Sequence, residues 1–334
     1  FISMKKFFTG AELVVECLIQ EKVKVIFGYP GGAVLPIYDE LFKQNSIRHI
    51  LVRHEQAAVH AAEGYARSTG KTGVVLVTSG PGATNTVTGL ADAMMDSIPI
   101  ICISGQVPTH MIGNDAFQEA DIVGITRPCT KHNFLVKDIH KLPEIIHSGF
   151  SIASKGRPGP VLIDIPKDVQ TFKTKYHGKK SLMKHLTYKP KISNNSDSLV
   201  DVVEMMKESS RPMLYIGGGI INSGLKATTE LLKLIKTSGF PFTQTLMALG
   251  AAPTSNEHFL GMLGMHGTYE ANQAMHKCDL LICIGARFDD RITGKVSGFS
   301  PNSKKIHIDI DPSSFNKSVN VNVTVQGDLK VILE

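Results

Sequence analysis

The chain has 334 residues, of which 42% are apolar, and a formal net charge of +6. A chain of this length is too long to fold around a single hydrophobic core, so we expect two domains. The positive charge is local, because the stretch 172–195 holds seven of the 36 Lys and Arg residues and no acidic residue, while the whole chain has 30 acidic residues. The composition therefore argues against a nucleic-acid-binding surface and indicates a solvated, lysine-rich connector.

The five cysteines include no Cys-x-x-Cys pair, which indicates a reducing compartment. Cys102 and Cys283 lie in strand-like apolar runs, and we expect them in the core. The sequence shows no transmembrane run and no signal-peptide cleavage site. We therefore expect a cytoplasmic protein, or one of the plastid stroma if the gene is organellar, with no membrane partner. Met4 is a candidate for the natural start.

The first half of the chain alternates short apolar strands with amphipathic helices. Thr9 and Glu12 predict a capping box for a helix that continues to Glu21. Nearly continuous apolar runs are typical of strands covered on both faces, and strand–helix alternation predicts a parallel sheet. The predicted strands are 23–27, 47–52, 74–78, 98–104 and 161–165.

A second series follows the connector. A helix begins near Asp197, another covers 225–238, and apolar strands are predicted at 213–217, 279–285 and 305–310. The fold class is therefore α/β, with two open parallel-sheet, three-layer domains. We place them at residues 1–172 and 197–334, joined by a lysine-rich linker at 173–196.

Glu55 lies where an apolar strand meets an alanine-rich helix predicted over 56–68, in which Gly64 is expected to allow close packing. Burial disfavours the ionised form of a carboxyl group and suits it to proton exchange. The alternative is an acidic residue that only complements the helix dipole. His54 and Glu55 do not form a His-Glu-x-x-His zinc helix, and we predict no metal site in this chain.

Two glycine-rich segments follow predicted strands. The loop 79–85 opens a helix and could cradle a phosphate, although its spacing fits neither the dinucleotide nor the Walker pattern. The run Gly217-Gly218-Gly219 would let a backbone approach a pyrophosphate, but it lacks the full Gly-x-Gly-x-x-Gly spacing. The paired acids Asp289 and Asp290 are expected to cap helices or meet a ribose.

Seven segments in a fixed order resemble those of thiamine-diphosphate-dependent 2-ketoacid enzymes, most closely the large catalytic subunits of acetolactate synthases. The segments are 28–36, 53–58, 78–85, 115–119, 156–160, 263–267 and 285–291. The resemblance covers essentially the whole chain. It implies an N-terminal domain that binds the pyrimidine of thiamine diphosphate and a central domain that binds FAD.

The resemblance also implies roles for single residues. Glu55 would hydrogen-bond to ring nitrogen N1′ of the cofactor and relay a proton through it. Gln118 would lie near Glu55, and Lys167 and Arg291 would face a 2-ketoacid carboxylate. The implied catalytic residues are Glu55, Gln118 and Lys167, and the implied substrate contacts are Gly32, Ala33, Phe117, Lys167 and Arg291. The implied cofactor contacts are Glu55, Gly31, Gly32, Pro81, Asn85, Arg157, Gly217, Gly218, Leu263, Gly264, Met265, His266, Gly285, Arg287, Asp289, Arg291, Asp309, Ile310 and Asp328.

The implied reaction is the decarboxylating condensation of pyruvate with a second 2-ketoacid, pyruvate or 2-ketobutyrate, in branched-chain amino-acid synthesis. FAD would be structural, and Mg²⁺ with the diphosphate would be held by a C-terminal domain that we do not find in this sequence, so the chain alone is expected to be inactive. The resemblance further implies a homodimer or higher oligomer and leaves open a small regulatory subunit.

Other functions remain open. A pyruvate oxidase or a carboligase would use the same cofactors, although glyoxylate carboligase lacks the Glu at position 55. As it stands, the chain could also be a non-catalytic FAD-binding or assembly module. A sirtuin-like protein would need a catalytic His or a zinc pair, which we do not find.

Overall fold

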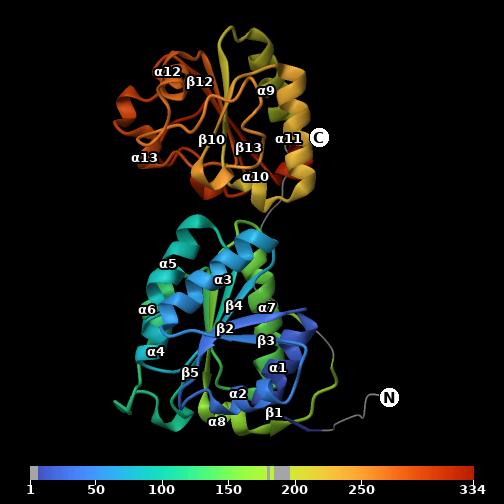
Figure 1. The fold of residues 1–334 in the computed structure, drawn as a ribbon, viewed down its shortest axis with the longest axis vertical. Coiled ribbons are helices and arrows are strands. Elements are labelled where there is room, and N and C mark those ends of the chain that lie inside the picture. The colour runs from blue at the N-terminus through green and yellow to red at the C-terminus, as the bar shows by residue number, and fades with distance from the viewer. Residues whose placement is uncertain (1–6, 179–180, 184–195) are drawn as a thin grey trace. The chain divides into compact units, whose positions relative to one another are not determined.

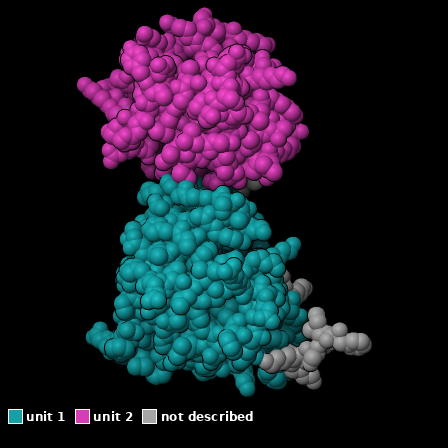
Figure 2. Space-filling view, viewed as in Figure 1, with its two compact units in different colours: residues 1–189 teal, residues 190–334 magenta. Residues whose placement is uncertain are grey.

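The computed structural model describes residues 7–178, 181–183 and 196–334. The chain divides into two compact units, residues 1–189 and 190–334 (Figure 2), and this division falls inside the predicted linker. Among the described residues, no helix has the length and apolar character needed to cross a membrane.

The first unit is built on six parallel strands in the order β3-β2-β4-β5-β7-β6. All five strands predicted for this half are confirmed, within two residues at each end. The short strand β6 was not predicted, because only two of its four residues are apolar. The strands are β2 Val25–Tyr29, β3 Arg48–Leu51, β4 Gly73–Val77, β5 Ile100–Gln106, β6 His132–Leu135 and β7 Pro160–Pro166.

Helices cover both faces of this sheet (Figure 1), which confirms the three layers. On one face, α1 (Gly10–Gln20) packs against α2 (Leu35–Phe42), α7 (Leu142–Ser154) and α8 (Lys167–Thr171). On the other, α3 (Glu55–Thr69) packs against α5 (Val87–Asp96), with the short α4 (Pro81–Thr84) and α6 (Ile122–Thr126) nearby.

Two local predictions for this unit have opposite outcomes. The capping box is confirmed, since the Glu12 N–H donates to Thr9 Oγ1 at 3.2 Å and the Thr9 N–H donates to Glu12 Oε2 at 2.8 Å. The close packing expected at Gly64 is wrong, because a Cβ there would meet nothing within 4 Å. Alanine-rich composition alone therefore does not identify the buried face of α3.

The boundary of the first unit also needs correction. Residues 173 and 174 were assigned to the linker, but they form strand β8 (Lys173–Thr174), which pairs antiparallel with β1 (Phe8–Thr9). Further along, the Met183 N–H donates to Ser148 Oγ at 2.8 Å. The first unit therefore continues beyond residue 172, and residues 179–180 and 184–195 of the predicted linker lie outside the described residues.

The second unit has five parallel strands in the order β10-β9-β11-β12-β13. Three of them were predicted; β10 and β13 were not, because runs of three and four residues give too short a periodic signal. Alternate residues of β11 enter two different apolar clusters, which confirms that both sheet faces are covered. The strands are β9 Pro212–Ile216, β10 Phe242–Gln244, β11 Leu280–Ile284, β12 Lys304–Asp309 and β13 Val323–Gln326.

Helices again lie on both sides of this second sheet. One apolar cluster includes residues of α11 (Leu225–Ser238), which matches the predicted helix, and of α14 (Leu329–Ile332). Residues of α9 (Ser196–Glu208) pack against the same cluster. The other cluster includes Met275 of α12 (Tyr269–Lys277). Two four-residue helices, α10 (Gly219–Asn222) and α13 (Asp290–Thr293), follow strand ends.

Candidate functional site

Glu55 is the first residue of α3 and is only 7% exposed. The Asn85 amide Nδ2 donates to Glu55 Oε2 at 2.9 Å. No described residue donates to the other carboxylate oxygen, Oε1, which lies 3.3 Å from where a Cβ on Gly82 would be. The carboxylate is therefore held on one side by Asn85 and has room on the other side, beside a glycine.

The turn at residues 31–33 lies against the residue that follows β4. The Ala33 N–H donates to Thr78 Oγ1 at 3.2 Å, and a Cβ on Gly31 would lie 2.8 Å from that same oxygen. Because β2 and β4 are parallel neighbours, the loops after their carboxyl ends meet at one edge of the sheet. A Cβ on Gly82 would also lie 2.6 Å from Thr78 Cγ2. Thr78 thus links the turn to the loop that carries Pro81 and Asn85.

The loop that carries Phe117 and Gln118 reaches this edge through its backbone. Gly80 has a φ of 55°, and a Cβ there would lie 2.5 Å from the Gln118 carbonyl oxygen. The Gln118 side chain is exposed, and the described hydrogen bond to the Glu55 carboxylate comes from Asn85. Phe117 is 86% exposed. The backbone of this loop is thus held against Gly80, while both side chains point away from the packed interior.

A buried carboxyl group that we did not single out from the sequence anchors the far end of that loop. Asp164, in β7, accepts from Ser104 Oγ at 2.6 Å and from Gln106 Nε2 at 2.9 Å. The same Gln106 amide donates to the Ala120 carbonyl at 2.9 Å. Burial raises the pKa of Asp164 to about 7, against the opposing effect of its hydrogen bonds with Ser104 and Gln106. An acidic residue inside the apolar run 161–166 was the available sequence signal.

Lys167 is exposed and follows β7 directly, at the same carboxyl edge. Its helix α8 is tied to the turn at 31–33, because Gln170 Nε2 donates to the Ala33 carbonyl at 2.7 Å. The elements that carry Glu55, Ala33, Gln118 and Lys167 therefore all belong to one edge of the first sheet.

Arg157 has a different local role from the cofactor contact expected for it. Its Nε donates to Ser97 Oγ at 2.8 Å, and one terminal nitrogen donates to the carbonyls of Met94 and Met95 at 3.2 and 3.3 Å. These carbonyls end α5, where a guanidinium is favoured by the helix dipole. Within the first unit, Arg157 therefore ties the 156–160 loop to the end of α5.

In the second unit, the glycines predicted to contact a pyrophosphate lie close to other parts of the same unit. A Cβ on Gly217 would lie 2.2 Å from the Gly285 carbonyl oxygen, and a Cβ on Gly218 would lie 2.9 Å from Met247 Cβ. The Gly219 N–H donates to that same Gly285 carbonyl at 2.9 Å. Close approach of the ends of β9 and β11 is therefore sufficient to explain why Gly217 lacks a side chain.

The segment 263–267 lies beside Arg291. The Met265 N–H donates to the Arg291 carbonyl at 2.9 Å, and a Cβ on Gly264 would lie 2.7 Å from that oxygen. Leu263 is buried in the core of the unit, whereas Met265 is 66% exposed and His266 is exposed. The structure therefore brings this segment and Arg291 together, but the Leu263 side chain serves the core and the Met265 side chain is not packed inside the unit.

The acids expected to meet the cofactor act locally as caps or turn formers. Asp289 caps α13 and Asp328 caps α14, each accepting from a backbone N–H two residues on. The hydrogen bond from the Arg291 N–H holds the pKa of Asp289 below its usual range. The Asp311 N–H donates to Asp309 Oδ1 at 2.8 Å. Asp309 is the last residue of β12, and Gly285, the exposed Arg287, Asp289, Ile310 and Asp328 lie just after the carboxyl ends of β11, β12 and β13.

A cavity of about 650 Å³ in the first unit lies away from Glu55. Its lining includes Val25, Gly70 and Thr72, at the amino ends of β2 and β4. Ligands of open parallel sheets bind at the carboxyl ends of the strands. The residues around Glu55 are therefore the better candidate site.

Comparison with known proteins finds a matching domain family in each of the two units. Residues 8–125 match the N-terminal TPP binding domain of thiamine pyrophosphate enzymes, and residues 199–334 match their central domain. The chain is 49% identical over 332 residues to the acetolactate synthase large subunit of Haemophilus influenzae and to the acetolactate synthase isozyme 3 large subunit of Escherichia coli. It is 50% identical over 325 residues to the acetolactate synthase of Mycobacterium leprae.

These three alignments cover 97 to 99% of the chain. They cover only 52 to 57% of the relatives. The chain therefore spans little more than half the length of the curated relatives that it matches.

Proposed function

Because the chain belongs to the thiamine pyrophosphate enzymes, we propose that it is part of an acetolactate synthase. The reaction is the condensation of pyruvate with a second 2-ketoacid, with loss of CO₂. The similarity to acetolactate synthases along nearly the whole chain supports this proposal. The observation that carries it is the buried Glu55 carboxylate, held by Asn85 and open on its other oxygen.

The residues around Glu55 fit the aminopyrimidine ring of thiamine diphosphate. A carboxylate oxygen without a described donor suits a ring nitrogen that shares a proton, and Gly82 leaves room beside it. When bound, the cofactor supplies a nucleophilic carbon and an electron sink. Glu55 would exchange the proton at the ring nitrogen, while Asn85 keeps the carboxylate oriented.

The other side chains of this edge would serve the substrate. Lys167 is exposed at the start of α8 and offers a cation to a 2-ketoacid carboxylate. Phe117 is an exposed aromatic side chain on the neighbouring loop and would cover the substrate's apolar end. The backbone contact between Gly80 and Gln118 would set the position of that loop.

The remaining cofactors and partners are part of the same proposal. FAD would lie along the carboxyl edge of the second sheet, where Gly285 and Asp328 follow strand ends and Asp309 is the last residue of β12. Mg²⁺ with the diphosphate would be held by a segment outside these 334 residues, in a homo-oligomer that could also carry a small regulatory subunit. We place the reaction in the cytoplasm or the plastid stroma.

The test is the rate of acetolactate formation from pyruvate by the complete enzyme with thiamine diphosphate, Mg²⁺ and FAD. We expect Glu55→Gln to lower kcat by roughly 10²- to 10⁴-fold, the usual size of a lost proton-transfer group. Glu144→Gln is the matched control, since Glu144 is also an acidic residue in the first turn of a helix of this unit. Equal rates in the two variants would contradict the role of Glu55. Peroxide formed in place of acetolactate would favour a pyruvate oxidase.

A further inference from the structure

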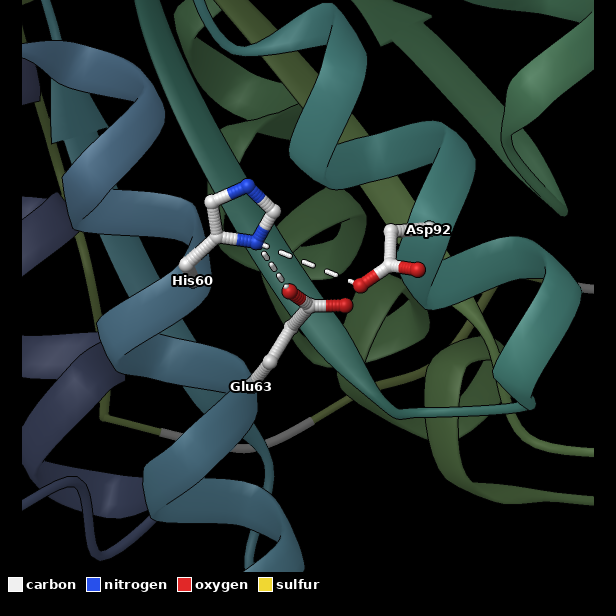
Figure 3. A group of neighbouring side chains, drawn as sticks. All are labelled: His60, Glu63 and Asp92. Atoms are coloured by element: carbon white, nitrogen blue, oxygen red, sulfur yellow. Dashed lines mark hydrogen bonds and ion pairs between the residues drawn. The ribbon is translucent and has the colours of Figure 1, made fainter. Parts of the chain in front are cut away.

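Three side chains that could hold a metal ion meet between α3 and α5, outside the site described above. His60 and Glu63 lie on α3, and Asp92 lies on α5 (Figure 3). His60 Nδ1 is 2.7 Å from Glu63 Oε2 and 4.0 Å from Asp92 Oδ2. One ligand atom from each residue lies within 4.8 Å of the other two. The group therefore offers one imidazole nitrogen and two carboxylate oxygens to one point.

A cluster of surface side chains does not by itself explain why Glu63 is buried. Glu63 is only 3% exposed, and its Oε1 is buried without a hydrogen-bond partner. In Figure 3 this second oxygen lies on the side of Asp92. A buried carboxylate oxygen that faces another carboxylate, with no donor, is costly unless a proton or a cation lies between them.

We propose that His60, Glu63 and Asp92 form a binding site for a divalent transition-metal ion such as Zn²⁺. Imidazole favours Zn²⁺ over Mg²⁺ and Ca²⁺, and carboxylate oxygens are accepted ligands of Zn²⁺. Ligands about 2.1 Å from a tetrahedral zinc are roughly 3.4 Å apart. The separations of 2.7 and 4.0 Å lie on either side of that value, so side-chain shifts below about 1 Å would suffice.

Such an ion would join the two elements that position the candidate site. Glu55 is the first residue of α3, and Asn85 lies two residues before the start of α5. His60 follows Glu55 by about one and a half helical turns. A metal bound across α3 and α5 would therefore act as a clamp that holds the Glu55–Asn85 contact. The clamp itself does not depend on the proposed function.

The test is a titration of the purified, tag-free chain with Zn²⁺ and with Co²⁺, followed by calorimetry and by the visible absorption of bound Co²⁺. We expect one ion per chain, no competition from excess Mg²⁺, and a rise in the unfolding temperature of the first unit. Asp92→Asn and His60→Asn should each weaken binding by more than about 100-fold, since even an outer-shell partner costs 10- to 100-fold. Asp92 and His60 are exposed, so both variants should fold.

The matched control is His276→Asn, which removes an exposed histidine of α12 in the other unit. It should leave the affinity and the Co²⁺ spectrum unchanged. All five cysteines are buried, so thiolates are not expected to compete for the ion. The proposal is overturned if no ion binds to the folded chain. It is equally overturned if Asp92→Asn and His60→Asn bind the ion as tightly as the control.

Discussion

The carboxyl edges of the two parallel sheets are built in different ways. In the first unit, polar side chains hold the loops together: Asn85 bonds to Glu55, Thr78 bonds to the turn at 31–33, and Asp164 anchors Gln106. In the second unit, backbone packs directly on backbone, because Gly217 and Gly219 lie against Gly285. The first edge contains a buried, hydrogen-bonded carboxylate, whereas the second offers a close-packed surface with exposed side chains.

This difference shows that the glycines of a glycine-rich motif can serve two different purposes. Gly82 leaves room beside the buried Glu55 carboxylate, while Gly217 leaves room for the Gly285 carbonyl and for Ala286. A glycine that follows a strand therefore does not by itself indicate a ligand. Whether a glycine makes room for a ligand or for another part of the protein depends on the atoms that a side chain at that position would contact.

The largest expected effect tests whether the first edge depends on a buried polar group. Burial raises the pKa of Asp164 to about 7 from a usual value near 4, so the folded state binds the proton more tightly than the unfolded state. The free energy of unfolding should therefore fall as pH rises from about 4 to about 7, by roughly 4 kcal/mol at about 1.4 kcal/mol per pH unit.

Asp164→Asn should remove this pH dependence. The new amide can donate to Ser104 Oγ while its oxygen accepts from Gln106, so the network is kept in a neutral form. Urea unfolding of the first unit at several pH values measures the difference between variant and parent, and Asp39→Asn, on the exposed side of α2, is the control. Parallel pH curves for parent and Asp164→Asn would show that the buried carboxyl group carries no such cost.

The next effect tests the backbone packing of the second edge. Gly217→Ala places a Cβ 2.2 Å from the Gly285 carbonyl oxygen, so two strand ends must separate. We expect a loss of about 3 kcal/mol in the stability of the second unit, the upper range for overpacking. Hydrogen exchange of the β9 and β11 amides is the measurement.

Gly298→Ala is the control for that substitution, since a Cβ there meets nothing within 4 Å. Its effect should stay within about 0.5 kcal/mol. If Gly217→Ala is equally mild, the close approach to Gly285 does not explain the glycine, and a ligand contact becomes the better reading.

A smaller effect is expected at Arg157, the residue whose sequence-based role differs most from its local contacts. Arg157→Ala removes hydrogen bonds to Ser97 and to the last carbonyls of α5. We expect the first unit to lose about 2 kcal/mol, with Arg127→Ala, an exposed cation of the same unit, nearly neutral. Thermal unfolding and FAD content, measured on the same samples, separate the two roles. Loss of FAD with unchanged stability would instead support the cofactor contact that the sequence predicts for Arg157.

The sequence predicted the architecture well where periodicity is long. Five strands of the first sheet and three of the second follow from apolar runs, and the capping box at Thr9 follows from two residue types at a fixed spacing. Strands β6, β10 and β13 were missed because three or four residues carry little periodic signal. The antiparallel pair of β1 and β8 joins chain segments more than 160 residues apart, which local patterns do not encode.

The candidate site was predictable only in part. Position after a strand indicated Glu55 and the 79–85 loop, because parallel strands bring such loops to one edge. The contacts that orient them were not predictable: Asn85 lies 30 residues from Glu55, and Asp164 lies 58 residues from Gln106. Both pairs depend on strand order, which residue patterns along a single strand do not specify.

We propose above that the Glu55 carboxylate activates the cofactor through proton exchange. The most direct measurement is the rate at which the C2 proton of bound thiamine diphosphate exchanges with deuterium in the complete enzyme, sampled by acid quenching and NMR. We predict that Glu55→Gln slows this exchange by about 100-fold or more, while Glu144→Gln leaves it unchanged. An exchange rate in Glu55→Gln equal to that of the parent, with the cofactor still bound, would contradict this role of Glu55.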